Sequence, residues 1–299
     1  MSLRLEGTYT ALVTPFRDEP GHPIDWAALD GLVDAQVAGG VAGVVPCGTT
    51  GESPTLSHEE HREVVERTVK RVAKRAQVIA GAGSNSTREA VGLAQHAERA
   101  GADAVMIVVP YYNKPSQDGL VHHFVEVARN VRLPVIVYNI PGRSVVDLAP
   151  GSLARICAQA SNVIGIKEAT GNVLRAQTLA RMFGDRMVVL SGDDALTLPM
   201  IAVGARGVIS VTSNVLPAAV SRATLLAIEG KMEEARLAHL ALLPVHEAMF
   251  IDASPGPVKV ALALKGLAQS AVRSPLCVPS EATRGVISAA LDAYARSGH

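Results

Sequence analysis

The chain has 299 residues, of which 28 are basic and 28 acidic, so its formal net charge is zero. Nucleic-acid and anionic-membrane surfaces are bound by clustered positive charge, so this balance argues against both kinds of partner. Hydrophobic residues make up 48% of the chain, enough for a sizeable core, and the length suits either one large α/β barrel or two ordinary domains.

Short, almost continuously apolar runs alternate with longer amphipathic stretches along the chain. Such runs are typical of parallel strands that are covered on both faces. They predict strands at residues 9–13, 41–45, 77–80, 104–109, 134–138, 163–166, 187–190 and 207–211. The stretches between them predict helices at residues 26–38, 58–71, 87–99, 117–130, 151–160, 172–183 and 196–203. A Ser followed three residues later by Glu predicts a capping box at two helix starts, Ser57 with Glu60 and Ser86 with Glu89.

The alternation predicts an α/β protein built as a closed (β/α)8 TIM barrel, because eight strands are each followed by a helix without a break in composition. Further helical patterns follow the eighth strand at residues 217–228, 232–250, 258–267 and 281–296. One of these helices closes the barrel, and the others form a C-terminal helical extension. We therefore expect a barrel with the active site at residues 1–228 and a C-terminal helical domain at residues 229–299.

The three cysteines, Cys47, Cys157 and Cys277, lie far apart and form no CxxC pair. This spacing suggests neither a zinc site nor a disulfide framework, and it suits a reducing compartment. Residues 1–10 lack the apolar core of a signal peptide, and no apolar run approaches the roughly 20 residues of a membrane span. We therefore expect a cytoplasmic protein that does not enter a membrane.

Polar or glycine-rich segments follow the apolar runs at the points where the strands should end. In a (β/α)8 barrel these segments are the loops that form the active site. They lie at residues 47–52, 81–85, 110–113, 138–143, 167–170 and 191–194. We expect all of them to face one cavity.

Lys167 is the most informative of these residues, because it directly follows a buried apolar run. Burial disfavours the ammonium form, so such a lysine can lose a proton and attack a carbonyl as an amine. The structural alternative is a lysine that is paired with Glu168 or another carboxylate at a strand end. Lys259 is a competing candidate at the start of an apolar helix, but its setting is typical of a surface lysine.

Three further positions suit chemistry beside an amine, and each has a structural alternative. The Tyr138 phenol can shuttle protons, although a core tyrosine bonded to the backbone would fit as well. Arg143 suits capture of a carboxylate, although a loop arginine is most often solvated. Thr49 and Thr50 lie between glycines and offer hydroxyl and N–H groups to a carboxylate, although a tight turn explains the glycines equally well.

Other motifs are weaker. Residues 81–86 approach a dinucleotide fingerprint, but Ser86 occupies the third glycine position and the segment follows the third strand. The run His58-Glu59-Glu60-His61 lacks the spacing of a zinc-binding helix. We expect no metal and no organic cofactor.

Taken together, the strand ends resemble the dihydrodipicolinate synthase (4-hydroxy-tetrahydrodipicolinate synthase) family of class I pyruvate-dependent aldolases. The motifs occur in order at residues 48–53, 110–115, 138–143, 165–170, 191–194 and 208–212, so the resemblance covers essentially the whole chain. It implies a (β/α)8 barrel with a C-terminal helical domain, in a homotetramer that is a dimer of dimers. It also implies a lyase that condenses pyruvate with L-aspartate 4-semialdehyde to 4-hydroxy-tetrahydrodipicolinate, in the diaminopimelate route of lysine biosynthesis.

The resemblance implies catalytic roles for four residues. Lys167 would form a Schiff base with pyruvate, and the resulting iminium would become an enamine that attacks the aldehyde. Tyr138 would donate and accept protons, linked through Thr49 to Tyr112 of the neighbouring subunit. The protonated imine is itself the electron sink, so this chemistry needs no cofactor.

The resemblance also implies two sets of binding residues. For the substrates, these are Thr50 and the backbone of Ile209 for the pyruvate carboxylate, Gly192, and Arg143 for the semialdehyde carboxylate. For L-lysine as an inhibitor at a dimer interface, they are Ser53, Pro54, His58, His61, Asn85, Glu89 and Tyr111. The structural alternative at this second site is that Glu89 completes the capping box of Ser86 and that the two histidines are solvated.

The sequence departs from the family pattern at residues 254–259, where Ser-Pro-Gly-Pro-Val-Lys replaces the common Asn-Pro-Ile-Pro-Val-Lys. The alternative activities are those of N-acetylneuraminate lyases and 2-keto-3-deoxy sugar-acid aldolases, which share the barrel and the lysine. Thr49, the paired tyrosines and Arg143 favour the synthase. A catalytically silent barrel would lack Lys167 or Tyr138, and both are present.

Overall fold

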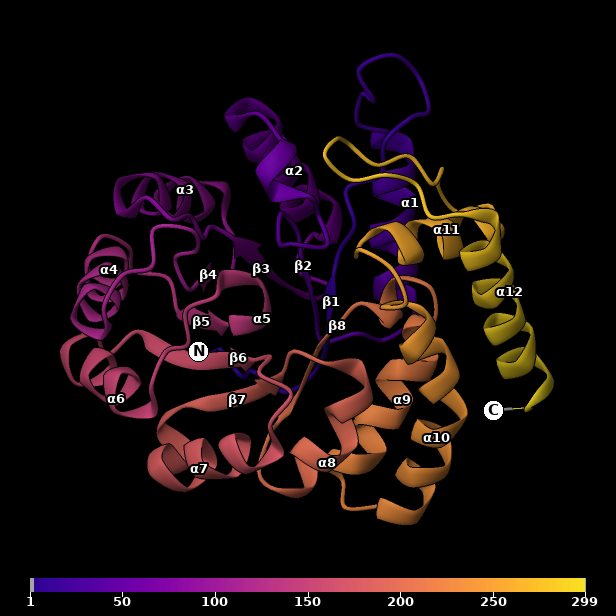
Figure 1. Cartoon of the computed structure of the whole chain (residues 1–299). Helices are drawn as coiled ribbons and strands as arrows, with labels where there is room; N and C mark the ends of the chain where they lie inside the picture. Colours follow the sequence, from indigo (N-terminus) through magenta and orange to yellow (C-terminus); the bar gives the residue numbers. More distant parts are fainter. Residues whose placement is uncertain (1–2, 299) are drawn as a thin grey trace.

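A computed structural model describes residues 3–298 and places eight parallel strands in a closed barrel surrounded by helices (Figure 1). The strands follow one another in chain order, and β1 pairs with β8 to close the barrel. They are β1 (Gly7–Ala11), β2 (Gly43–Val45), β3 (Gln77–Gly81), β4 (Ala104–Val108), β5 (Val135–Asn139), β6 (Val163–Glu168), β7 (Val188–Ser191) and β8 (Gly207–Ser210). The predicted (β/α)8 fold is confirmed.

Among residues 3–298, the α-helices lie outside the barrel, and four short 3-10 turns lie in its loops. The α-helices are α1 (Trp26–Ala38), α2 (His58–Val72), α3 (Thr87–Ala100), α4 (Gln117–Arg129), α5 (Pro141–Ser144), α6 (Pro150–Gln159), α7 (Val173–Phe183), α8 (Thr197–Ala202), α9 (Pro217–Ile228), α10 (Met232–Ala248), α11 (Gly256–Leu264) and α12 (Glu281–Arg296). The 3-10 turns are η1 (Ser53–Thr55), η2 (Gly184–Arg186), η3 (Asp194–Leu196) and η4 (Thr212–Asn214). Helix α5 was not predicted, because it is a single turn and its Pro-Gly sequence is typical of a loop.

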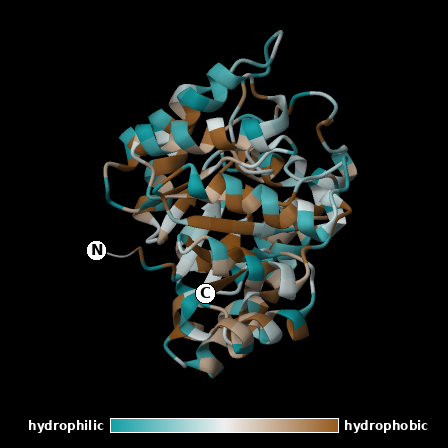
Figure 2. Cartoon of the chain, turned by 90° about the vertical axis from the view of Figure 1, so that its left-hand side faces the viewer, coloured by the Kyte–Doolittle hydropathy of each residue, from teal (hydrophilic) through white to brown (hydrophobic). Residues whose placement is uncertain are grey.

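The strands are buried because helices cover their outer faces and side chains fill the barrel. Figure 2 shows hydrophobic residues along the central strands and hydrophilic residues on the outer helices. Gly81 is required at the end of β3, since a Cβ there would lie 2.2 Å from the carbonyl oxygen of Cys47. This close approach brings the loop after β2 against the loop after β3.

Of the two predicted capping boxes, one is confirmed and the other is wrong. At α2, Ser57 Oγ accepts the N–H of Glu60 at 3.1 Å, and Glu60 accepts the N–H of Ser57 at 2.9 Å. At α3, Ser86 makes no side-chain cap, because the Glu89 carboxylate turns instead to the Ser84 hydroxyl and the His58 ring.

The helices after β8 pack together on one side of the barrel. Helix α10 lies against α9 and α12, and α11 contacts α12 and η4 (Figure 1). Polar side chains also join this group to the barrel, since Lys259 of α11 pairs with Glu52 in the loop after β2. Within residues 3–298, no helix is both long enough and apolar enough to cross a membrane.

Candidate active site

Lys167 and Tyr138 lie side by side where two neighbouring strands end. The two residues are register partners across β5 and β6. The Nζ atom of Lys167 lies 4.1 Å from the centroid of the Tyr138 ring, and the residues are only 5% and 4% exposed. An amine and a phenol thus share one buried layer at the carboxyl end of the barrel.

Neither Glu168 nor any other carboxylate among the described residues pairs with Lys167, so the structural alternative is wrong. Successive residues of a strand point to opposite faces, and the buried Glu168 carboxylate faces away from Lys167 to pair with Arg175 at 3.1 Å. The same carboxylate accepts the N–H of Thr170 at 2.8 Å. Among the described residues, no carboxylate forms an ion pair with Lys167, which leaves its amine for another role.

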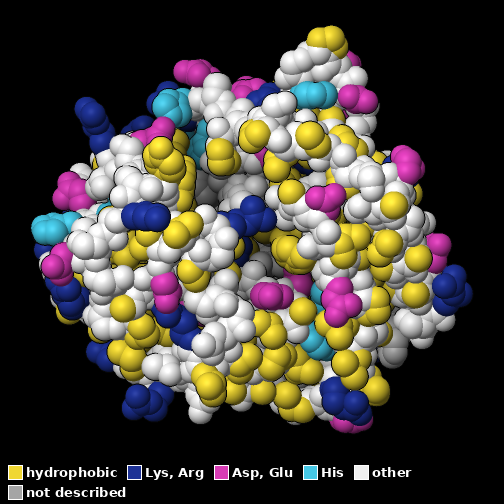
Figure 3. All heavy atoms as spheres, in the orientation of Figure 1, with side chains coloured by type: hydrophobic (Ala, Val, Ile, Leu, Met, Phe, Trp, Pro, Cys, Tyr) yellow, Lys and Arg dark blue, Asp and Glu magenta, His cyan; other side chains and the backbone are white. Residues whose placement is uncertain are grey.

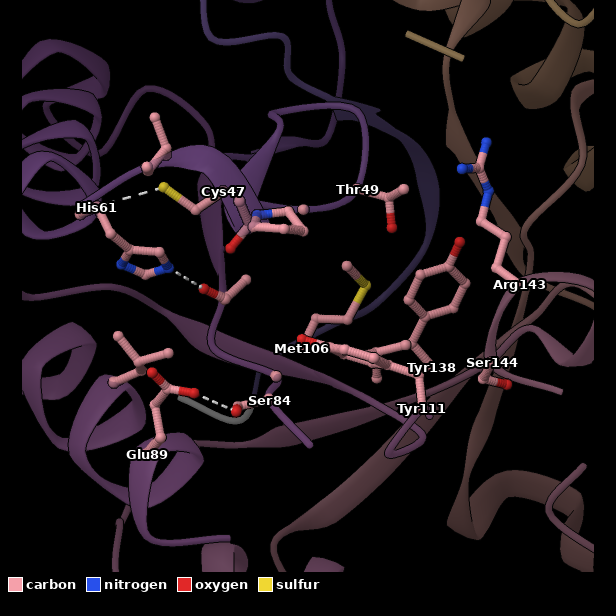
Figure 4. A pocket seen from close by; sticks show the side chains of 18 of the residues that line it. Cys47, Thr49, His61, Ser84, Glu89, Met106, Tyr111, Tyr138, Arg143 and Ser144 are labelled. Atoms are coloured by element: carbon pink, nitrogen blue, oxygen red, sulfur yellow. Dashed lines mark hydrogen bonds between the residues drawn. The ribbon is translucent and has the colours of Figure 1, made fainter. Parts of the chain in front are cut away.

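A cavity of about 400 Å³ opens beside this pair. Figure 3 shows the hollow near the centre of this face, with basic side chains next to it. The cavity runs from Tyr138 and Arg143 past Thr49 and Met106 to the space between α2 and α3 (Figure 4). Lys167 is not a lining residue itself, but its amine lies against the Tyr138 ring that lines the cavity.

The loop after β2 forms a tight turn that presents Thr49 to the cavity. The N–H of Gly51 donates to the Gly48 carbonyl at 3.1 Å, and the Thr14 hydroxyl donates to the Gly51 carbonyl at 2.7 Å. Thr49 lines the cavity, whereas Thr50 is buried beside it. The tight turn and the cavity-lining position of Thr49 therefore occur together.

Arg143 projects from α5 at the mouth of the cavity. Figure 4 shows the Tyr138 hydroxyl directed toward the space between Thr49 and Arg143. One Arg143 nitrogen lies 3.5 Å from the Ser254 carbonyl oxygen, and no carboxylate among residues 3–298 forms an ion pair with it. The guanidinium thus faces the cavity with its charge uncompensated.

The structure does not bring every predicted residue into this cavity. Tyr112 is 89% exposed at a backbone φ of 67°, pointing away from the chain that carries it. Ile209 is buried at the end of β8, and Gly192 follows β7, where a Cβ would lie 2.5 Å from the Ala169 Cβ. Neither residue lines the cavity.

The part of the cavity between α2 and α3 contains six of the seven residues of the predicted lysine site: Ser53, Pro54, His58, His61, Glu89 and Tyr111. Asn85 is absent from the lining, and its carbonyl accepts the Asn113 side chain at 2.9 Å. The Ser84 hydroxyl and then the His58 ring lower the pKa of Glu89. His58 is exposed, but His61 is buried, and its burial lowers its pKa to about 4. The structural alternative of two solvated histidines is therefore wrong for His61.

Lys259 is not the surface lysine that its sequence setting suggested. It is 1% exposed and forms a buried ion pair with Glu52, which follows the Thr49–Gly51 turn. Burial lowers the pKa of Lys259 to about 8, while the Glu52 charge opposes that shift. The prediction of a surface lysine is wrong because Glu52, the partner of Lys259, lies more than 200 positions away in the sequence.

The role of Asp194 was not predicted from the sequence. Its buried carboxylate accepts the N–H groups of Val211 at 2.8 Å and Thr212 at 3.2 Å, and the Ser210 hydroxyl at 2.5 Å. The loop after β7 thereby fixes the loop after β8. The only sequence signal was the acidic pair at residues 193–194, in the loop that follows a predicted strand.

Comparisons with known proteins agree with this geometry. The family model described as the dihydrodipicolinate synthetase family matches residues 4–294. A 4-hydroxy-tetrahydrodipicolinate synthase of Sorangium cellulosum is 55% identical over 97% of this chain and 96% of its own length.

Two solved structures share the fold over nearly the whole chain. Dihydrodipicolinate synthase from Acinetobacter baumannii, complexed with pyruvate, has a TM-score of 0.95 at 39% identity, with coverage of 98% of this chain and 99% of that one. The synthase from Cyanidioschyzon merolae, with lysine bound, has a TM-score of 0.93 at 35% identity, with coverage of 97% and 98%. The relatives' names favour the synthase over the lyase and sugar-acid aldolase alternatives. The chain therefore belongs to the dihydrodipicolinate synthetase family, as the strand-end motifs predicted.

Proposed function

We propose that this chain condenses pyruvate with L-aspartate 4-semialdehyde to give 4-hydroxy-tetrahydrodipicolinate, with Lys167 as the covalent residue. The observation that carries the proposal is the buried pair of Lys167 and Tyr138, whose amine and ring lie 4.1 Å apart at adjacent strand ends. Family membership supplies the reaction, and the pair supplies a nucleophile with a proton donor beside it.

The first half of the reaction forms the nucleophile. The Lys167 amine attacks the keto carbon of pyruvate, and Tyr138 transfers a proton so that water leaves the carbinolamine. The resulting iminium loses a proton from the methyl group and becomes an enamine. The surrounding apolar strands exclude water, which protects the imine from hydrolysis.

The second half forms the carbon–carbon bond. The enamine carbon attacks the aldehyde, and a proton reaches the new alkoxide. The amino group of the semialdehyde then attacks the imine carbon, which closes the ring and releases the Lys167 amine. In this scheme Arg143 binds the semialdehyde carboxylate, since its guanidinium lies at the cavity mouth without an acidic partner among the described residues.

The pyruvate carboxylate lies between two loops. Thr50 and the Ile209 backbone bind this carboxylate. Gly192 has no side chain, so the loop after β7 can lie close to the bound pyruvate. Thr49 connects Tyr138 to Tyr112 of a neighbouring copy, in a relay that crosses between subunits. The 89% exposure of Tyr112 supports this assignment, because a tyrosine that is turned outward is available to a second subunit.

Several wider assignments belong to the same proposal. The chain forms a homotetramer as a dimer of dimers and works in the cytoplasm. The barrel comprises residues 1–228 and the helical domain residues 229–299. L-Lysine binds between α2 and α3 as an inhibitor, where Glu89 supplies a carboxylate for its ammonium group. The position of Glu89 in the cavity lining supports this last assignment.

Reduction with borohydride in the presence of pyruvate tests the proposal. We expect a reduced three-carbon adduct on the peptide that contains Lys167, found by mass spectrometry, and none in Lys167→Met. An adduct on Lys259, or no adduct, contradicts the assignment. A coupled assay with L-aspartate 4-semialdehyde beside N-acetylneuraminate separates the synthase from a lyase.

A further inference from the structure

A buried polar network joins the loop after β2 to the C-terminal part of the chain. It consists of Glu52, Lys259 and Arg273, arranged around the ring of Phe16, and we refer to it as the Glu52 network. Phe16 is fully buried, with the Lys259 Nζ 4.0 Å and the Arg273 guanidinium carbon 4.3 Å from its ring centroid. Two cations thus lie over one apolar ring, and the Glu52 carboxylate contacts the residues of both.

Each oxygen of the Glu52 carboxylate is directed to the C-terminal part. One oxygen pairs with the Lys259 ammonium, which also donates to the Ala271 carbonyl at 2.9 Å. The other accepts the backbone N–H of Arg273 at 2.9 Å. The carboxylate therefore holds both α11 and the segment after it.

Arg273 extends the network to α2 and the loop after β1. Its guanidinium pairs with Glu60 at 2.6 Å and donates to the Thr55 carbonyl at 3.0 Å and the His22 carbonyl at 2.9 Å. Residues on both sides of the Thr49–Gly51 turn are thereby fixed to one side chain.

Glu52 adopts a backbone conformation that needs support. Its φ is 53°, in the left-handed region, where a non-glycine residue costs of order 1 kcal/mol or more. Its N–H donates to the Thr49 carbonyl at 3.1 Å, which closes the turn that carries Thr49 and Thr50. A strained residue two positions from Thr50 thus depends on the contacts of its side chain.

We propose that the Glu52–Lys259 ion pair is a positioning device for the Thr49–Thr50 turn, through which α11 sets the pyruvate-carboxylate site. Neither residue contacts the cavity, so both act through the turn. A buried ion pair contributes little net stability relative to apolar residues of the same volume, and its directional contacts favour one fixed geometry. The inference rests on the proposed function, because it assumes that Thr50 binds pyruvate.

The test compares variants of the pair with a matched control. Glu52→Gln keeps the shape and an acceptor for the Arg273 N–H, and Glu52→Gln/Lys259→Met removes both charges together. The control is Lys265→Met, which removes an exposed lysine at the end of the same helix. We measure kcat and the pyruvate KM in the coupled assay, the rate of borohydride trapping at Lys167, and the circular dichroism of each protein.

We expect the pyruvate KM to rise about tenfold or more in both variants of the pair, with slower trapping, and to stay at the wild-type value in Lys265→Met. KM does not depend on the fraction of folded enzyme, so a purely structural role would lower only the apparent kcat.

A pyruvate KM within twofold of wild type in either folded variant overturns the inference. So does failure of both variants to fold, because the pair would then be a folding element. Absence of a pyruvate adduct in the wild type contradicts the proposed function instead.

Discussion

His61 makes the folded protein sensitive to acid. The residue lines the cavity wall but is itself buried, and its Nε2 lies 2.9 Å from the Gly81 carbonyl oxygen. Its Nδ1 has no hydrogen-bond partner among the described residues. Burial lowers its pKa from 6.5 to about 4, so the folded protein keeps the imidazole neutral where an unfolded chain would protonate it.

The size of the effect follows from the two pKa values. Below pH 6.5 the His61 imidazole binds a proton in the unfolded chain but stays neutral in the folded protein. The free energy of unfolding therefore falls as the pH falls toward 4. Between pH 7 and pH 5 the loss due to His61 is about 2 kcal/mol, and it reaches about 3 kcal/mol near pH 4. Above pH 6.5 the imidazole is neutral in both states, so His61 then causes no loss of stability.

Urea unfolding at pH 7 and pH 5 measures this loss, at one protein concentration because assembly adds to stability. His61→Gln retains a side-chain amide that reaches the Gly81 carbonyl and cannot titrate. We expect this variant to lose about 2 kcal/mol less than wild type over the same pH interval. His122→Gln, on the exposed side of α4, is the matched control and should lose as much as wild type.

Equal losses in wild type and His61→Gln would refute the argument. His123 is buried in the same way, and its burial also lowers its pKa to about 4. It titrates identically in all three proteins, so its contribution cancels in the comparison. The difference between the variants therefore reports on His61 alone.

Three further predictions concern charges around the cavity and the barrel. Arg143→Ala should raise the barrier for L-aspartate 4-semialdehyde by about 2 to 5 kcal/mol and leave borohydride trapping with pyruvate largely intact; equal losses in kinetics and trapping would make the arginine structural. Glu89→Ala should weaken inhibition by L-lysine in the coupled assay and keep the catalytic rate, whereas a wild-type enzyme insensitive to millimolar lysine would end that idea. Arg175→Met leaves the buried Glu168 carboxylate without its ion pair and should cost about 3 to 5 kcal/mol in urea unfolding; a loss below 1 kcal/mol would show that the carboxylate is satisfied by its other contacts.

Periodicity was enough to predict the barrel, because continuous apolar runs have few other solutions when helices alternate with them. It also placed Lys167 and Tyr138 at strand ends, and the register of β5 and β6 makes them neighbours. The end of β6 was less predictable. The strand continues through Glu168, whose charge marked it as a loop residue but whose partner Arg175 comes from the following helix.

Two errors share one physical cause. The sequence around Lys259 and around Glu89 fits a common local arrangement, a surface lysine in one case and a capping box in the other. In the folded protein each side chain binds a group from another element, Glu52 for Lys259 and His58 for Glu89. A local sequence pattern indicates which interactions a side chain can make with its neighbours in the chain. It contains no information on a competing partner that is distant in sequence and close only in the folded protein.

The Glu52 network also affects the order in which the protein becomes complete during synthesis. The ribosome releases residues 48–52 early, whereas Lys259 and Arg273 emerge more than 200 residues later. Contacts between such distant segments form late, because closing a long loop costs entropy before the contact repays it. A nascent chain therefore carries the Thr49–Thr50 turn unsecured through most of translation, and the turn reaches its final surroundings only when α11 docks.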